Sequence, residues 1–234
     1  MPQGRRSFVH CIETVCFDYY GTLVKIGKPY VRIRKWMCER LAEQGKEALE
    51  AAFYYCFTKR RLKLLGEGKP FLRGADAMVQ GCMHACRTFD VNIDEDRFRG
   101  LLWQMFREPP AFKEAHTVLS QLKRKYRIGL LTNADNDVLY ESIRLQGFHF
   151  DFICSSEDMR SNKPQPAFFA GAVARHALDR QHTMMVGDSL TEDILPAAEM
   201  GWTSVLAVRG QEKVPPEICC VESLTELSEI LRQK

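Results

Sequence analysis

The sequence predicts an α/β protein in which helices cover both faces of a parallel β-sheet and a separate group of helices is inserted into the chain. Short apolar runs alternate with amphipathic stretches of helical periodicity along the 234 residues. The apolar runs are continuous, which is typical of strands buried on both faces of a parallel sheet. Between residues 29 and 108 only helical patterns occur. The expected fold is therefore a Rossmann-like, doubly wound sheet with an inserted α-helical domain.

The expected strands are continuous apolar runs that end in polar or small residues. They lie at residues 12–18, 127–132, 152–155, 183–188 and 203–208, with a weaker one at 218–221. Helical patterns separate these runs, at residues 113–125, 136–146, 166–177, 192–200 and 223–232. A strand that is followed by a helix and then by another strand forms the repeating unit of a parallel sheet.

The inserted segment contains four amphipathic patterns and no convincing strand. We expect helices at residues 30–44, 46–65, 74–89 and 94–106, separated by glycine and proline residues. The sheet domain therefore consists of residues 1–28 and 109–234, and the helical insert comprises residues 29–108.

Composition limits the classes of function. The formal net charge is +3, with 45% hydrophobic and 27% charged residues, which gives no indication of a nucleic-acid partner. No apolar stretch approaches the roughly 18 residues of a membrane span, and the N-terminus does not have the pattern of a secretory signal. The nine cysteines are an odd number and favour free thiols. We expect a cytoplasmic monomer or homodimer that acts on a small molecule, without a nucleic-acid or membrane partner.

Polar residues follow several of the expected strands. Asp18 ends the first apolar run, and Thr132 with Asn133 ends the second. Lys163 lies after the third run, whereas Asp188 and then Asp193 follow the fourth. Ligands of open parallel sheets bind outside the carboxyl ends of the strands, so these side chains are candidates for one common site.

The order of these motifs resembles that of the haloacid dehalogenase (HAD) superfamily: Asp, then Thr or Ser, then Lys, then Gly-Asp-x-x-x-x-Asp. The helical insert resembles the C1-type cap of that superfamily. The resemblance implies that Asp18 is a nucleophile that forms a covalent intermediate. It also implies that Thr132 and Lys163 face the charge that develops on the transferred group, and that Lys163 holds the nucleophile in place.

The resemblance further implies a Mg²⁺ cofactor. Mg²⁺ prefers oxygen ligands, and the family's ligands correspond to Asp18, the backbone carbonyl of Tyr20 and Asp188. Asp193 corresponds to a residue behind the ligands that orients waters or Lys163. Tyr20 and Asn133 are expected to contact the substrate.

Tyr20 departs from the phosphatase pattern, in which a second Asp acts as the general acid. A Tyr with a pKa near 10 is a poor acid at neutral pH. Four hypotheses therefore remain. The first is a Mg²⁺-dependent phosphatase limited to good leaving groups. The second is a metal-independent 2-haloacid dehalogenase, whose common motif is Asp-x-Tyr-Gly-Thr. The third is a phosphonate hydrolase that uses Lys59, Lys63 or Lys69, and the fourth is a non-catalytic ligand-binding protein.

The acids at Asp188 and Asp193 favour the phosphatase hypothesis, because dehalogenases of the family have Ser-Asn where this chain has Gly187-Asp188. The helical insert is rich in basic residues: Arg32, Arg34, Lys35, Arg60, Arg61, Lys63 and Arg73. Such a surface suits a small anionic substrate. The expected function is Mg²⁺-dependent hydrolysis of a small phosphorylated substrate through Asp18.

Overall fold

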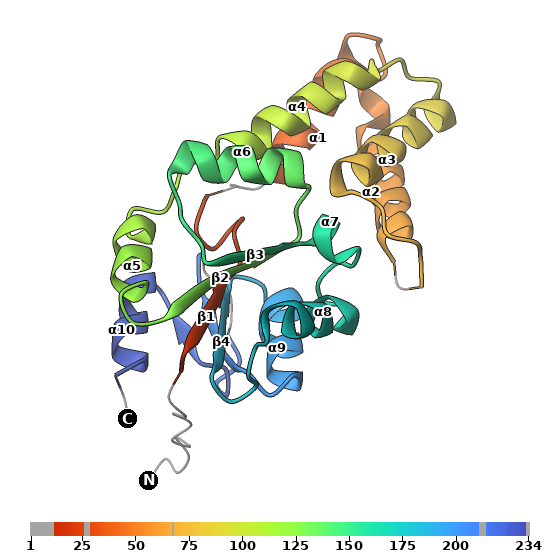
Figure 1. Cartoon of the computed structure of the whole chain (residues 1–234). Coiled ribbons are helices and arrows are strands. Elements are labelled where there is room, and N and C mark those ends of the chain that lie inside the picture. The colour runs from red at the N-terminus through yellow and green to blue at the C-terminus, as the bar shows by residue number, and fades with distance from the viewer. Residues whose placement is uncertain (1–11, 26–28, 67, 211–213, 233–234) are drawn as a thin grey trace.

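The computed structural model describes residues 12–25, 29–66, 68–210 and 214–232. Its centre is a six-stranded, all-parallel sheet with the order β3-β2-β1-β4-β5-β6 (Figure 1). The strands are β1 (Thr14–Phe17), β2 (Arg127–Thr132), β3 (Phe152–Ser155), β4 (Thr183–Gly187), β5 (Thr203–Ala207) and β6 (Cys220–Val221). The expected α/β fold with a doubly wound parallel sheet is confirmed.

Strand β1 occupies the centre of the sheet and pairs with β2 on one side and β4 on the other. Phe17, its last residue, is in register with Leu130 of β2 and Val186 of β4. The chain runs outward from β1 to β3 and then crosses back to run outward again from β4 to β6. The carboxyl ends of β1 and β4 therefore form the switch point at which doubly wound sheets bind ligands.

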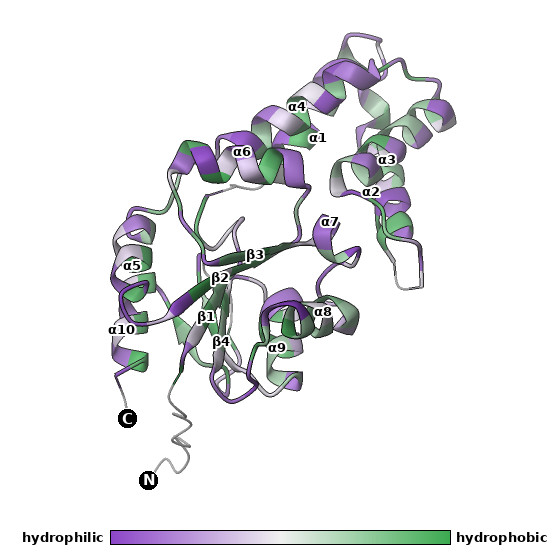
Figure 2. Ribbon diagram, in the orientation of Figure 1, coloured by the Kyte–Doolittle hydropathy of each residue, from purple (hydrophilic) through white to green (hydrophobic). Residues whose placement is uncertain are grey.

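Helices pack on both faces of the sheet. One apolar core joins Val15 and Phe17 of β1 to α5 (Ala115–Leu122), α6 (Asn136–Gln146) and α10 (Leu227–Ile230). A second core joins Cys16, whose side chain points to the opposite face, to α8 (Pro166–His176) and α9 (Leu195–Glu199). Figure 2 shows the strands in the green of apolar residues, with purple on the outer sides of the flanking helices.

The helical insert lies between β1 and β2 in the sequence. It consists of α1 (Pro29–Ala42), α2 (Glu50–Leu65), α3 (Gly74–Phe89) and α4 (Glu95–Arg107). These helices share a third apolar core, in which Phe53, Phe57 and Phe98 are fully buried. In Figure 1 the insert lies beyond the carboxyl edge of the sheet, and α4 runs alongside α6, which it contacts.

The structure differs from the expected elements where helices are short or irregular. The expected helix at 192–200 is a π-helical turn (Leu190–Ile194) followed by α9, whose second residue is Pro196. A proline has no N–H to donate to a regular helical ladder, so the helix pattern changes there. The expected helix at 223–232 begins as a 3₁₀ turn (Leu224–Glu226), and the one at 46–65 begins as another (Glu47–Leu49). Helix α7 (Ser156–Met159) was not expected.

None of the described helices is both long and apolar enough to cross a membrane. The N-terminal residues, in which no secretory signal was expected, lie outside the described part of the chain.

Candidate active site

Asp18 lies directly after the last residue of β1, at the centre of the carboxyl edge. Its backbone N–H donates to the carbonyl of Val186 at 2.9 Å, which continues the pairing between β1 and β4 for one more residue. The residue is 6% exposed. Oδ1 accepts a hydrogen bond from Nζ of Lys163 at 2.8 Å, and Oδ2 lies 3.4 Å from the hydroxyl of Thr22. The sheet therefore holds this carboxylate in a fixed and nearly dry position.

Lys163 is buried with all of its ammonium protons engaged. Besides Asp18, Nζ donates to Oδ1 of Asp193 at 2.5 Å and to the carbonyl of Leu131 at 2.9 Å. Burial alone lowers the pKa of Lys163, but the carboxylates of Asp18 and Asp193 outweigh this effect and raise the pKa above its ordinary value. The side chain is therefore a permanent ammonium that holds two carboxylates together.

Three carboxylates gather at this point. Oxygens of Asp18, Asp188 and Asp193 all lie within 4.8 Å of one another. Burial and the charge of Asp18 raise the pKa of Asp188 to about 7, although the hydrogen bond from Thr22 at 3.2 Å opposes this. Burial likewise raises the pKa of Asp193 to about 7, against the opposing charge of Lys163. One ammonium does not neutralise three carboxylates, so the donor set suits an additional cation.

Two glycines allow the carboxylates to approach the backbone. Gly21 has φ +95°, and a Cβ there would lie 2.2 Å from Oδ2 of Asp188. A Cβ at Gly187 would lie 2.3 Å from Oδ2 of Asp193. Any other residue at either position would displace an acidic side chain of the site.

Asn133 holds the backbone of Lys163. Its Oδ1 accepts from the Lys163 N–H at 2.7 Å, and its Nδ2 donates to the Lys163 carbonyl at 2.9 Å and to Oε2 of Glu192 at 3.2 Å. Asn133 was expected to contact the substrate, whereas in this structure its amide is engaged by the protein. Thr132, the last residue of β2, is 1% exposed and lies in register with Ser155.

Tyr20 follows Asp18 by two residues, and its hydroxyl is directed away from the acidic cluster toward the helical insert. The hydroxyl donates to the carbonyl of Phe106, in the last turn of α4, at 2.9 Å. The ring packs edge-on against Tyr19 and Phe106, with centroids 4.9 and 5.4 Å away. Burial, together with the nearby Tyr19 and the carboxylates of Asp135 and Asp18, raises the pKa of Tyr20 well above its usual value. In this arrangement Tyr20 is a packing and anchoring residue.

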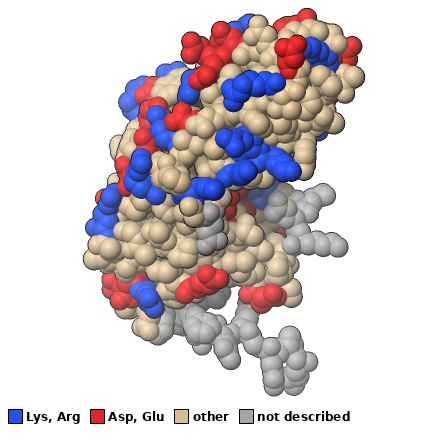
Figure 3. Space-filling model, turned by 90° about the vertical axis from the view of Figure 1, so that its right-hand side faces the viewer, with Lys and Arg blue, Asp and Glu red and all other residues tan. Residues whose placement is uncertain are grey.

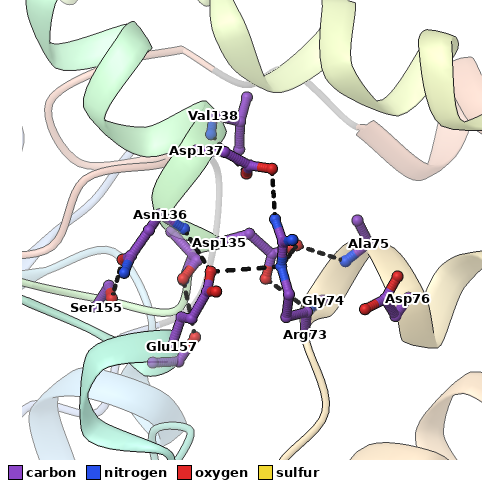
Figure 4. A network of polar contacts seen from close by, with 12 residues as sticks. Arg73, Gly74, Ala75, Asp76, Asp135, Asn136, Asp137, Val138, Ser155 and Glu157 are labelled. Atoms are coloured by element: carbon purple, nitrogen blue, oxygen red, sulfur yellow. Dashed lines mark hydrogen bonds and ion pairs between the residues drawn. The ribbon is translucent and has the colours of Figure 1, made fainter.

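Three further polar residues belong to the neighbourhood of the site and were not among the predicted candidates. Thr22 bridges Asp18 and Asp188 and is fully buried. The sequence indicated it only by its position, four residues after Asp18. Glu192 bonds to Asn133. Asp135, three residues after Thr132, lies at the junction of sheet domain and insert and accepts hydrogen bonds from α3 (Figure 4). Asp135 and α3 are far apart in the sequence, so only the fold brings them together.

The lysines of the insert lie on its surface. Lys59 and Lys63 of α2 and Lys69 after it are exposed, and Nζ of Lys59 lies 5.6 Å from the ring centre of Tyr55. In Figure 3, basic side chains gather over the middle of the face turned toward the viewer, with few acidic ones among them. This charge favours the approach of an anion.

A doubly wound parallel sheet with a buried Asp–Lys–Asp group at the switch point, facing a helical insert after the first strand, defines the class of haloacid dehalogenase-type α/β enzymes. The comparison with known families agrees with this class. The chain belongs to the haloacid dehalogenase-like hydrolase family, whose model matches residues 12–201.

Curated relatives include both a general family member and phosphatases. The chain is 32% identical to haloacid dehalogenase-like hydrolase domain-containing protein 3 of Danio rerio, over 92% of this chain and 95% of the relative. It is 29% identical to glyceraldehyde 3-phosphate phosphatase of Methanothermobacter thermautotrophicus, over 51% of this chain and 58% of that one. It is 30% identical to the same-named protein of Methanocaldococcus jannaschii over 45% of that protein's length. The matches therefore span about half the length of these phosphatases.

Solved structures share the fold across the whole chain. The HAD-hydrolase YfnB of Bacillus subtilis, bound to magnesium, has a TM-score of 0.73 at 19% identity, over 95% of this chain and 99% of that one. The defluorinating L-2-haloacid dehalogenase Rha0230 has a TM-score of 0.73 at 18% identity, over 99% and 100%. At this level of identity the likeness shows the fold alone.

Proposed function

We propose that this protein is a Mg²⁺-dependent phosphatase that hydrolyses a small phosphorylated substrate through Asp18. The acidic cluster is the observation that carries this proposal, because Asp188 and Asp193 lie within 4.8 Å of Asp18. Displacement of a halide from carbon by a carboxylate needs no cation, and uncompensated acids would weaken the nucleophile. Transfer of a phosphoryl group, in contrast, develops charge on oxygens that a cation stabilises.

Asp18 is the proposed nucleophile. Lys163 engages Oδ1, which leaves Oδ2 to attack phosphorus while the bond between phosphorus and the leaving oxygen breaks. The product of this step is an aspartyl phosphate, which water then hydrolyses to return the carboxylate and release phosphate. Lys163 and the hydroxyl of Thr132 would face the charge on the transferred group.

Asp18, Asp188 and the backbone carbonyl of Tyr20 would hold the Mg²⁺. The ion would supply Lewis-acid stabilisation of phosphoryl oxygens when bound. Asp193 has a different proposed task, since its Oδ1 accepts from Lys163 and its Oδ2 accepts from the backbone N–H of Ser189 at 3.1 Å. With both oxygens engaged, Asp193 orients the lysine.

The leaving group limits the substrate. In this structure Tyr20 donates its hydroxyl proton to Phe106 and has a raised pKa, so it is a poor proton donor to a departing alkoxide. We therefore propose a preference for leaving groups that need no proton, such as acyl phosphates. The names of the relatives, glyceraldehyde 3-phosphate phosphatase and phosphoserine phosphatase, support a small phosphorylated metabolite. Residues 29–108 would form the cap over it, and their basic surface would attract it.

A substrate assay tests this function. The purified protein is incubated with p-nitrophenyl phosphate, acetyl phosphate and L-2-chloropropionate, each with Mg²⁺ and with EDTA. We expect phosphate release that requires Mg²⁺ and is fastest with acetyl phosphate. Asp18→Asn should abolish it. If nothing is turned over while inorganic phosphate still binds, the non-catalytic hypothesis is favoured instead.

The second candidate is a 2-haloacid dehalogenase, and Tyr20 is the observation that favours it. A halide leaves without a proton, so this reaction does not require an Asp at this position. Chloride release from L-2-chloropropionate that persists in EDTA would establish this alternative and overturn the phosphatase proposal. A phosphonate substrate would instead require a lysine from the insert within reach of the site, and cleavage lost in Lys59→Met, Lys63→Met or Lys69→Met would identify it.

A further inference from the structure

One contact between the helical insert and the sheet domain is made by a single buried carboxylate. Asp135, in the loop between β2 and α6, is 5% exposed. Its Oδ1 accepts from the N–H of Gly74 and its Oδ2 from the N–H of Ala75, both at 2.8 Å. Asp135 has the backbone position of an N-cap of its own helix α6, but its side chain makes no bond there. It caps α3, a helix of the insert, instead (Figure 4).

The charges around Asp135 favour this docking. The N-terminus of α3 presents the positive end of a 16-residue helix dipole. Arg73, directly before it, lies 3.8 Å from Asp135, 2.6 Å from Asp137 and 3.4 Å from Glu157. Three carboxylates of the sheet domain thus surround one guanidinium and one helix N-terminus of the insert. Separation of the two parts would leave these carboxylates close together without those compensating charges.

The loop that carries Asp135 also contacts the candidate active site. Two residues before Asp135, Asn133 holds both the N–H and the carbonyl of Lys163 at 2.7 and 2.9 Å. One residue earlier still, Thr132 ends β2. This short segment therefore touches the insert at one end and fixes the backbone of the site lysine at the other.

We infer that Asp135 is a positioning residue that holds the helical insert over the active site, and that the loop it shares with Asn133 links this docking to the placement of Lys163. The catalytic part of this role rests on the proposed function, whereas the docking itself does not. Undocking of α3 frees the Asp135 end of the loop, and the amide of Asn133 then loses its fixed position against Lys163. The substrate therefore meets a correctly placed lysine only when the insert is docked.

The test compares Asp135→Ala and Asp135→Asn with Asp94→Ala. Asp94 is the matched control because it also caps a helix of the insert, accepting from the N–H of Arg97 at 2.8 Å, but does so within the insert itself. The first measurement is the rate of amide hydrogen exchange at Gly74, Ala75 and Lys163, which NMR detects. Small-angle X-ray scattering then reports the separation of the two parts, and steady-state kinetics with p-nitrophenyl phosphate provide kcat and KM.

We expect Asp135→Ala to speed exchange at Gly74, Ala75 and Lys163 by about tenfold or more and to increase the radius of gyration. KM should rise and kcat should fall. Asp135→Asn keeps one side-chain oxygen as an acceptor and should give intermediate values. Asp94→Ala should lower the melting temperature with none of these effects.

Faster exchange at Gly74 and Ala75 alone, with Lys163 and the scattering unchanged, would reduce Asp135 to a local helix cap and overturn the inference. Unchanged exchange at all three amides would also overturn it. If the wild-type protein hydrolyses no phosphate ester, the proposed function fails, but exchange and scattering still decide the docking role.

Discussion

At the scale of single residues, the site depends on one buried cation between two carboxylates. Lys163 has relative exposure of 3%, and both Asp18 and Asp193 bond to its ammonium. The two carboxylates outweigh the effect of burial on Lys163 and keep its pKa above the ordinary value. With Oδ1 of Asp18 bonded to Lys163, Oδ2 lies 3.4 Å from the hydroxyl of Thr22. The ion pair with Lys163 therefore also orients the proposed nucleophile.

We expect Lys163→Met to abolish turnover and to lower the free energy of unfolding by about 3 kcal/mol, because removal of one partner leaves two buried carboxylates without a counter-charge. Urea unfolding and the acetyl phosphate assay measure the two effects. Lys113→Met, at an exposed lysine, is the control and should leave both quantities unchanged. A Lys163→Met variant as stable as the wild type would show that the carboxylates do not depend on this ammonium.

The glycine before Thr22 permits a second residue-scale prediction. Gly21→Ala introduces a Cβ 2.2 Å from Oδ2 of Asp188 at φ +95°, so both strain and displacement of the carboxylate are expected, at a cost of about 3 kcal/mol or more. Gly45→Ala is the matched control, because Gly45 also has a positive φ, +64°, but has no atom near the added Cβ. Gly45→Ala should lower the free energy of unfolding by about 1 kcal/mol, the usual cost of a residue with a Cβ in the left-handed conformation. Equal losses in urea unfolding would show that Asp188 moves away freely.

At the scale of elements, the loop after β1 is connected to the end of α4 through Tyr20. The hydroxyl of Tyr20 bonds to the carbonyl of Phe106, and carbonyls in the last turn of a helix lack partners within the helix. Tyr20 therefore helps to fix the position at which the chain returns from the insert. This contact explains why a bulky aromatic residue suits a position two residues after Asp18.

Two substitutions separate packing from chemistry at Tyr20. Tyr20→Phe removes only the hydrogen bond and should cost about 1 kcal/mol in urea unfolding, while kcat changes little. Tyr20→Asp also removes the ring between Tyr19 and Phe106 and should cost about 3 kcal/mol or more. Tyr55→Phe, at a 64% exposed tyrosine, serves as the control. A Tyr20→Asp variant that is stable and turns over phosphate esters faster would show instead that Tyr20 is simply a missing acid.

How much the sequence revealed also differs from element to element. The bounds of β2, β3, α3 and α6 coincide with those expected. The two strands are continuous apolar runs, and the two helices have an amphipathic pattern that ends at a left-handed residue, Asp90 or Gly147. Helix α7 has only four residues and no period to detect. Asp188 and Lys163 could be chosen from their motifs, whereas the pairing of Asp135 with α3 joins residues about 60 positions apart and leaves no local pattern.

At the scale of the whole molecule, the carboxyl edge of the sheet holds three clustered carboxylates and one ammonium, Lys163, bonded to two of them. Burial raises the pKa of Asp188 and of Asp193 to about 7 from an ordinary value of 3.8. Without a metal, these two carboxyls therefore bind more protons in the folded protein than in the unfolded chain between about pH 4 and pH 7. These two groups make the free energy of unfolding fall as the pH rises through that window, and they add no further change above it.

Magnesium should reverse this trend, because it binds the deprotonated carboxylates and must compete with protons for them. We expect Mg²⁺ to raise the melting temperature clearly at about pH 8 and little at about pH 5, since stabilisation by a ligand grows with its affinity for the folded state. Asp188→Asn should remove the effect at both pH values, whereas Asp179→Asn, at an exposed aspartate outside the cluster, should retain it. A shift of equal size at both pH values, or one that survives in Asp188→Asn, would place Mg²⁺ outside the carboxylate cluster and would remove the main support for a metal-dependent phosphatase.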